Sequence, residues 1–146
     1  MSLILSGLLV FATISVAWFW FEGRWDRRLF AAQAGRKCVN VRARAAMELL
    51  QTHPEVQVLD VRSGKEFAGG ALPGAINVSL GADTFRERVA DLDRARPVLV
   101  YCAGGFRSRQ AVEVLRTLGF QTIYHLHRGY HSWKFAGLPA VQASKP

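Results

Sequence analysis

Short apolar runs alternate with segments of helical character over most of the chain. Three runs have the length and the β-branched content of strands: Val56–Val61, Pro97–Cys102 and Thr122–Leu126. Segments of helical composition lie before and between them, over residues 44–51, 84–92 and 108–118. Gly119 directly follows the last segment and is predicted to end that helix. This alternation predicts an α/β fold with a parallel sheet covered by helices on both faces.

The beginning of the chain follows a different pattern. The segment Ser2–Phe21 contains 20 residues without a charge, of which 11 are Leu, Ile, Val or Phe. As a helix it would span roughly 30 Å, about the hydrocarbon thickness of a bilayer. A cleaved signal peptide fits less well, because no Lys or Arg precedes the run and because the run is longer than the apolar region of such peptides. We predict one transmembrane helix over residues 2–21.

Positive charge is concentrated directly behind this segment. The chain has a formal net charge of +8, and residues 22–46 hold seven basic residues against two acidic ones. A basic segment beside a membrane span binds anionic lipid and is retained on the cytoplasmic side. We therefore expect a basic juxtamembrane segment over residues 22–37 in a single-pass protein, of the bacterial inner membrane, whose folded domain is cytoplasmic. Nucleic acid is not expected as a partner, because aromatic residues are not interleaved with these arginines.

The length and composition leave room for one folded domain behind the basic segment. The chain has 146 residues, half of them hydrophobic and 21% charged, which excludes a disordered or low-complexity protein. Two cysteines, Cys38 and Cys102, are too few for a disulfide framework, and a cytoplasmic setting disfavours a disulfide between them. We place the domain at residues 38–140, with a tail at 141–146.

Candidate chemistry follows the apolar run that ends at Cys102. In a parallel sheet, ligands bind beyond the carboxyl ends of the strands. The loop there reads Cys102, Ala103, Gly104, Gly105, Phe106, Arg107, Ser108. The two glycines permit positive φ, Arg107 adds a positive charge, and Ser108 is expected to cap the next helix. Together with the helix dipole these features favour a thiolate at Cys102, although a cysteine that merely ends a buried strand is the alternative.

This loop resembles the active-site loop of rhodanese-like sulfurtransferases, C-x-x-G-x-R-S. A second stretch resembles a segment of that family through Leu59–Arg62, Glu66, Phe67, Gly70 and Leu72–Asn77. A closing motif resembles the end of the family's domain through Gly129, Trp133, Gly137, Leu138 and Pro139. Two positions depart from the family pattern: Ala71 replaces a histidine and Arg128 replaces a glycine, which leaves the local loop geometry open. The resemblance covers residues 38–140 in the correct order.

The resemblance implies that Cys102 is the catalytic nucleophile. It would take the sulfane sulfur of a donor such as thiosulfate as a persulfide and pass it to a thiol or cyanide acceptor. Residues 103–108 would bind the anion, with their amides on the sulfur and with Arg107 orienting the donor or stabilising the loop. Asp60, Arg62 and Glu66 are expected to support the framework, with an ion pair between Arg62 and Glu66. No cofactor or metal is expected. A membrane protein or a sulfur-carrier protein is an expected further partner.

Two other functions stay open at this point. A rhodanese-like domain without chemistry could serve as a binding or regulatory module on a membrane tether. A phosphatase with a cysteine loop is the other, although phosphatase loops of the related type are one residue longer and this loop is too tight for a phosphate. Three histidines, His125, His127 and His131, lie close in sequence without an accompanying carboxylate pattern. We expect them to be solvated or capped by local hydrogen bonds rather than to bind metal.

Overall fold

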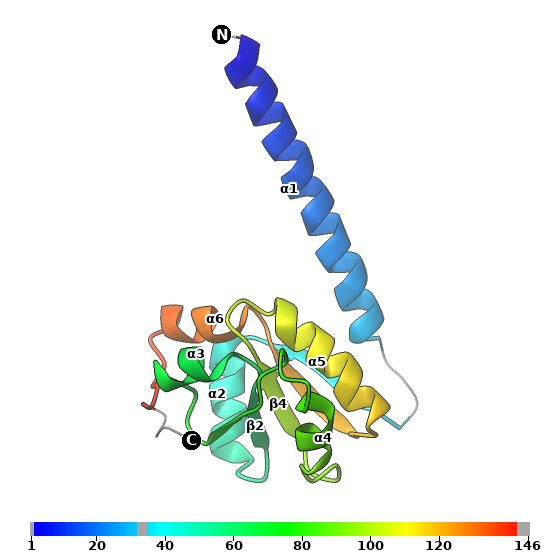
Figure 1. Ribbon diagram of the computed structural model, residues 1–146, viewed down its shortest axis with the longest axis vertical. Helices are drawn as coiled ribbons and strands as arrows, with labels where there is room; N and C mark the ends of the chain where they lie inside the picture. The colour runs from blue at the N-terminus through cyan, green and yellow to red at the C-terminus, as the bar shows by residue number, and fades with distance from the viewer. Residues whose placement is uncertain (1, 32–34, 143–146) are drawn as a thin grey trace. The chain divides into compact units, whose positions relative to one another are not determined.

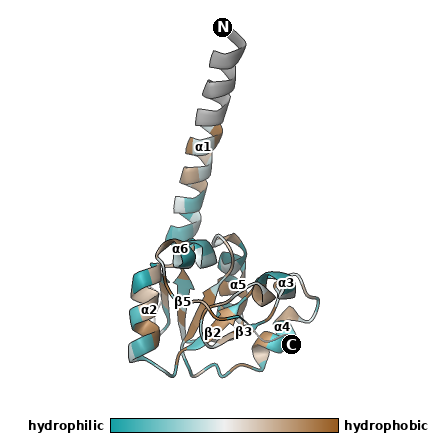
Figure 2. Ribbon diagram, turned by 90° about the vertical axis from the view of Figure 1, so that its left-hand side faces the viewer, coloured by the Kyte–Doolittle hydropathy of each residue, from teal (hydrophilic) through white to brown (hydrophobic). Residues whose placement is uncertain are grey.

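A computed structural model describes residues 2–31 and 35–142, with side chains from residue 13 onward. The chain divides into two units, Met1–Ala31 and Ala32–Pro146. The first unit is the helix α1, Ser2–Leu29, and its described part changes from hydrophobic to hydrophilic along its course (Figure 2). In the parts of the chain that the structure describes, no helix has both the length and the hydropathy of a membrane span. Residues 2–12 of the predicted span lie outside the described side chains.

The second unit is built on a five-stranded sheet, within the described residues, whose order is β1-β5-β4-β2-β3 and whose neighbouring strands are all parallel. The strands are β1 Lys37–Val41, β2 Gln57–Asp60, β3 Ala75–Asn77, β4 Val98–Tyr101 and β5 Thr122–Leu126. The three predicted strands are confirmed as β2, β4 and β5, the first two slightly shorter than expected. The sequence pattern did not predict β1 and β3. The predicted parallel sheet is confirmed.

In the described part of the second unit, four helices connect successive strands and a fifth, α6, follows β5: α2 Ala43–Thr52, α3 Gly64–Ala68, α4 Phe85–Ala90, α5 Phe106–Thr117 and α6 Gly129–Phe135. The three predicted helices are confirmed as α2, α4 and α5. The helix α5 begins two residues earlier than expected and ends before Gly119, whose φ of +92° is typical of the residue after a helix. The short helices α3 and α6 were not predicted.

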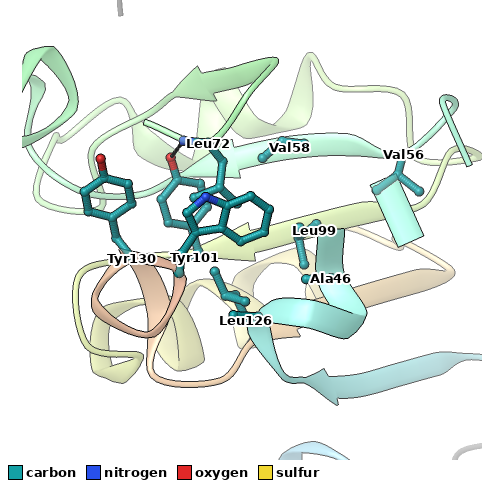
Figure 3. Close-up of a cluster of buried hydrophobic side chains, with 10 residues drawn as sticks. Ala46, Val56, Val58, Leu72, Leu99, Tyr101, Leu126 and Tyr130 are labelled. Atoms are coloured by element: carbon teal, nitrogen blue, oxygen red, sulfur yellow. Dashed lines mark hydrogen bonds between the residues drawn. The ribbon is translucent and has the colours of Figure 1, made fainter. Parts of the chain in front are cut away.

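Helices cover both faces of the sheet (Figure 1). On one face, α2 and α6 contribute Ala46 and Trp133 to a cluster with Leu99, Tyr101 and Leu126 (Figure 3). The helices α4 and α5 lie on the opposite face (Figure 1), where their own buried residues include Phe85, Val89, Ala111 and Leu115. Every residue of β2 and β4 is buried, as a parallel sheet covered on both sides requires. Burying one such large apolar side chain contributes about 1.5–3 kcal/mol.

The carboxyl ends of the three central strands bring the chemistry-bearing residues to one edge. Asp60 at the end of β2 lies beside Tyr101 at the end of β4, so Cys102 follows at the same level. His125 lies beside Val100 across the β4–β5 pair. A hydrogen bond from the backbone N–H of Val61 to the carbonyl of Tyr101, at 3.0 Å, continues the pairing of β2 and β4 to this edge. The edge therefore holds candidate residues from β2, β4 and β5 together.

Candidate active site

Cys102 lies one residue beyond β4, in the loop that leads into α5. The helix begins after Gly105, whose φ is +100°, and the backbone N–H of Gly105 donates a hydrogen bond to Cys102 Sγ at 3.1 Å. Ser108 Oγ lies 3.4 Å from the same sulfur, and Cys102 is 1% exposed. The sulfur is thus held at the positive end of a helix dipole by a fixed main-chain donor.

One local expectation for this loop is wrong. Ser108 does not cap the helix, because Gly105 occupies the N-cap position and Ser108 lies within the first turn. Its hydroxyl is turned inward, and Oγ lies 3.1 Å from the carbonyl oxygen of Gly105. Of the two glycines that permit positive φ, Gly105 adopts it and Gly104 does not. Phe106 is 43% exposed at the rim of the loop.

The N-terminus of α6 supports the same loop from the other side. The backbone N–H of Tyr130 donates to the carbonyl of Cys102 at 2.7 Å, and that of His131 donates to the carbonyl of Ala103 at 3.0 Å. Gly129 makes this approach possible, because a Cβ there would overlap the Cys102 carbonyl oxygen and lie 2.7 Å from the Ala103 oxygen. Arg128, which replaces a glycine of the family pattern, has a left-handed φ of 57°. The backbone at 128–131 therefore fixes where the loop carbonyls lie.

Asp60 and Arg62 form a buried ion pair beside the loop. Arg62 Nη2 lies 2.6 Å from Asp60 Oδ2, and it also donates to the Gly70 carbonyl at 2.7 Å. Its guanidinium stacks on the ring of Tyr130, 4.2 Å from the ring centre. Burial opposes the charge on Arg62, but the hydrogen bonds and the charge of Asp60 outweigh it and raise the pKa of the guanidinium. The pair ties β2 to the segment around Gly70.

Glu66 pairs with Arg107 and not, as predicted, with Arg62. Arg107 donates two hydrogen bonds to the Glu66 carboxylate, at 2.7 and 2.8 Å, and both side chains are 37% exposed. These bonds, with further ones from Ser63 at the start of α3, hold the pKa of Glu66 down to about 2. The same pair raises the pKa of Arg107. Arg107 therefore anchors the beginning of α5 to α3, and its charge is already balanced by a carboxylate.

His125 is a site residue that the sequence analysis did not find. We expected it to be solvated or locally capped, but it is fully buried under the loop, and its Nε2 lies 2.8 Å from Ser108 Oγ. Its Nδ1 lies 2.9 Å from Asn40 Oδ1 on β1. The alternation along β5 carries a signal for this position, because Ile123 and His125 share the buried face of the strand. In the described part of the chain, no three His, Cys, Asp or Glu side chains lie close enough to hold a metal.

A separate hollow lies at the opposite edge of the sheet, where the strands begin. Its lining includes Met47, Leu50, Val56 and Ile76, and it contains none of the loop residues. Cys102, the candidate nucleophile, therefore lies outside this hollow.

The arrangement of Cys102 and its loop lies in a region that matches a known protein family. A family model described as Rhodanese-like domain matches residues 43–136, which include Cys102 and both ion pairs. The chain belongs to this family. The resemblance seen in the motifs is thereby confirmed, and the second unit of the chain is a rhodanese-like domain. Its loop, with Cys102 between β4 and α5, lies within the matched region.

Relatives of this rhodanese-like domain have several functions. The chain is 35% identical over 79 residues to an uncharacterized protein, YqhL, of Bacillus subtilis, covering 54% of this chain and 61% of that protein. It is 33% identical over 78 residues to the thiosulfate sulfurtransferase GlpE of Shewanella oneidensis, covering 53% and 75%. Other relatives are named as a transcriptional regulator and as tRNA uridine(34) hydroxylases, of which the chain spans 39% and 29%.

A solved structure with the same fold is that of a polysulfide-sulfur transferase homodimer from Wolinella succinogenes. The TM-score is 0.61 at 29% sequence identity, and the match covers 85% of this chain and 91% of that one. The rhodanese-like fold is therefore shared with proteins whose names state sulfur transfer.

Proposed function

We propose that the protein is a sulfurtransferase that carries sulfane sulfur as a persulfide on Cys102. The observation that carries this proposal is the position of Sγ at the start of α5, 3.1 Å from the N–H of Gly105. A preorganised donor that points at a sulfur stabilises negative charge there without reorganisation. The names of two similar proteins, a thiosulfate sulfurtransferase and a polysulfide-sulfur transferase, support the same reaction class.

The reaction would proceed in two displacements at sulfur. The Cys102 thiolate attacks the outer sulfur of thiosulfate, a new S–S bond forms, and sulfite leaves with the electron pair of the broken bond. A thiolate or cyanide then attacks the outer sulfur of the persulfide, and the Cys102 thiolate leaves with the electron pair. Neither step moves a proton at the reacting sulfur, so the site needs donors for an anion rather than a general acid.

The ion pair between Arg107 and Glu66 bears on the rival functions. A phosphatase would need the arginine of the loop for the phosphate, but Glu66 takes two of its five N–H donors and balances its charge, which weakens it as a phosphate ligand. A binding module would need no nucleophile, whereas Cys102 is present with a main-chain donor on its sulfur. Both observations favour sulfur transfer.

The test is turnover by the full-length protein, measured as thiocyanate formed from thiosulfate and cyanide. We expect activity in the wild type and in Cys38→Ser, which keeps the site and serves as the matched control. Cys102→Ser should lose it. Equal rates in the wild type and in Cys102→Ser would overturn the proposal. Turnover of a phosphate ester that depends on Cys102, without thiocyanate formation, would redirect it to phosphatase activity, and no turnover of either substrate would redirect it to a binding module.

We propose in addition that residues 2–21 anchor the protein in a membrane and that the basic residues behind them lie against anionic lipid, with the domain in the cytoplasm. The uncharged run of 20 residues supports this, as do the exposed apolar side chains in its described part, such as Phe19 and Trp20 at 76% and 64% exposure. Full-length protein should stay with the membrane fraction after an alkaline carbonate wash. Release into the supernatant would contradict the anchor.

A further inference from the structure

A continuous chain of hydrogen-bonding groups leads from the nucleophile through the buried His125 to the partly buried Asn40 and His127. Cys102 Sγ lies 3.4 Å from Ser108 Oγ, which lies 2.8 Å from His125 Nε2. His125 Nδ1 lies 2.9 Å from Asn40 Oδ1, and Asn40 Nδ2 lies 3.3 Å from His127 Nδ1. Ser108 and His125 are fully buried. The persulfide steps described above use neither His125 nor the hydroxyl of Ser108.

Both ring nitrogens of His125 face oxygen atoms. Nδ1 faces the amide oxygen of Asn40, and Nε2 faces Ser108 Oγ and, at 3.2 Å, the carbonyl oxygen of Gly105. The Ser108 hydroxyl can donate or accept, but the amide oxygen of Asn40 and the carbonyl oxygen of Gly105 only accept hydrogen bonds, and a proton on each ring nitrogen satisfies both of them. A neutral imidazole carries one N–H, whereas the imidazolium carries two. The surroundings therefore complement the imidazolium better than either neutral tautomer.

Ser108 then has one hydroxyl proton to give. When His125 Nε2–H supplies the hydrogen bonds to Ser108 Oγ and to the Gly105 carbonyl, the hydroxyl proton of Ser108 is available to Cys102 Sγ. A thiolate is the stronger acceptor for it, since charge-assisted hydrogen bonds are the stronger ones. A buried cation is also costly unless an anion lies nearby, and the Cys102 thiolate supplies that anion.

We propose that His125 stores the proton that Cys102 gives up and, acting through Ser108, holds the nucleophile as a thiolate. The inference rests on the proposed function, because it assigns His125 a part in the same site. The S–H bond of Cys102 breaks and its proton goes to Ser108 Oγ, while the proton of Ser108 goes to His125 Nε2. No electrons are exchanged and the net charge is unchanged. His125 is thus a positioning residue that acts through Ser108.

Other charged and titratable groups lie near this relay. On α5, the buried Arg109 has Nη1 3.4 Å from the position of a Cβ on Gly105, which places its guanidinium beside the start of the helix. Directly after β5, His127 meets the relay through Nδ2 of Asn40, on the side away from the sulfur. The ion pairs Asp60–Arg62 and Arg107–Glu66 are each internally balanced. We therefore expect the protonation of His125 to depend on the ionisation of Cys102.

The first test observes the proton on His125 directly. Nitrogen-15 spectra of the histidine side chains in the full-length protein at neutral pH should show two protonated nitrogens on His125. In Cys102→Ser the anion is absent, so His125 should lose one of these protons. A singly protonated His125 in both proteins would overturn the proposal.

The second test measures how fast iodoacetamide alkylates Cys102 as a function of pH. In Ser108→Ala, which leaves His125 in place, the pH at half-maximal rate should rise by about one unit, so that alkylation below that pH slows about tenfold. His125→Gln should shift the profile in the same direction, and His127→Gln, the matched control on the far side of Asn40, should leave it unchanged. Profiles of Ser108→Ala and His125→Gln that coincide with the wild type would overturn the proposal.

Neither test requires sulfur transfer. An imidazolium that depends on Cys102, in a protein that forms no persulfide, would support the relay and contradict the proposed function. A persulfide on Cys102, in a protein whose His125 keeps the same protonation when Cys102 is replaced, would support the proposed function and contradict the relay.

Discussion

Replacement of Gly129 by alanine tests whether the close approach of α6 to the loop fixes the nucleophile. Gly129 has a φ of +54°, and a Cβ there would meet the carbonyl oxygens of Cys102 and Ala103. The left-handed conformation costs a non-glycine residue about 1–2 kcal/mol. Overpacking against backbone atoms that cannot swing aside adds about 1–3 kcal/mol. We therefore expect Gly129→Ala to lower the free energy of unfolding by about 2–5 kcal/mol.

The matched control is Gly137→Ala. Gly137 has a φ of +69° but has nothing within 4 Å of an added Cβ, so this variant pays the conformational cost alone, about 1–2 kcal/mol. The assay is denaturant unfolding of the full-length protein, together with thiocyanate formation by the fraction that folds. Gly129→Ala should also lose more activity, because relief of the overlap displaces the carbonyls of Cys102 and Ala103. Equal destabilisation in the two variants would refute the reasoning.

Three further predictions concern the ion pairs and the second cysteine. Asp60→Asn should lower the free energy of unfolding by about 3–5 kcal/mol in denaturant titrations, because it leaves the charge of Arg62 buried without its partner; a loss below about 1 kcal/mol would contradict this. The lowered pKa of Glu66 means that its pair with Arg107 stabilises the fold fully above about pH 4.5 and less as the pH falls toward 2. Lowering the pH should therefore reduce the free energy of unfolding of the wild type more than that of Glu66→Gln, by a modest amount since both side chains are partly exposed. Parallel curves of unfolding free energy against pH for the two proteins would contradict a stabilising pair. Burial raises the pKa of Cys38 to about 11, so alkylation of Cys38 at neutral pH should be slow and should rise with pH, and rapid neutral labelling would contradict its burial.

The sequence predicted the parts of the fold whose signals are local. The run before Cys102 is buried along its whole length, so its apolar character alone predicted β4 and placed the nucleophile at its end. The strand β1 is half exposed, with a polar lysine and an asparagine among its five residues, and β3 has only three residues. Neither strand has an alternation of apolar and polar residues that could be recognised in the sequence. The helices α3 and α6 have only five and seven residues, and their places depend on tertiary contacts.

The site residues show the same division between local and distant signals. Arg62 and Glu66 have the spacing of a helical ion pair, but Arg62 precedes the N-cap residue Ser63, so the two do not share a helix face. His125 was missed because Asn40 and Ser108, its partners, lie 85 and 17 residues away in the chain. Strand order brings them together, because β5 lies between β1 and β4. No spacing of residues along the sequence predicts such a cluster.

The central claim is that the sulfur of Cys102 is held ready to carry a second sulfur. The most direct measurement is the intact mass of the full-length protein and of its Cys102 peptide after treatment with thiosulfate and removal of the excess. The account predicts the added mass of one sulfur atom on Cys102 in the wild type and in Cys38→Ser, its loss after addition of cyanide, and no addition in Cys102→Ser. An unmodified Cys102 peptide in folded wild-type protein, or sulfur found on Cys38 instead, would contradict it.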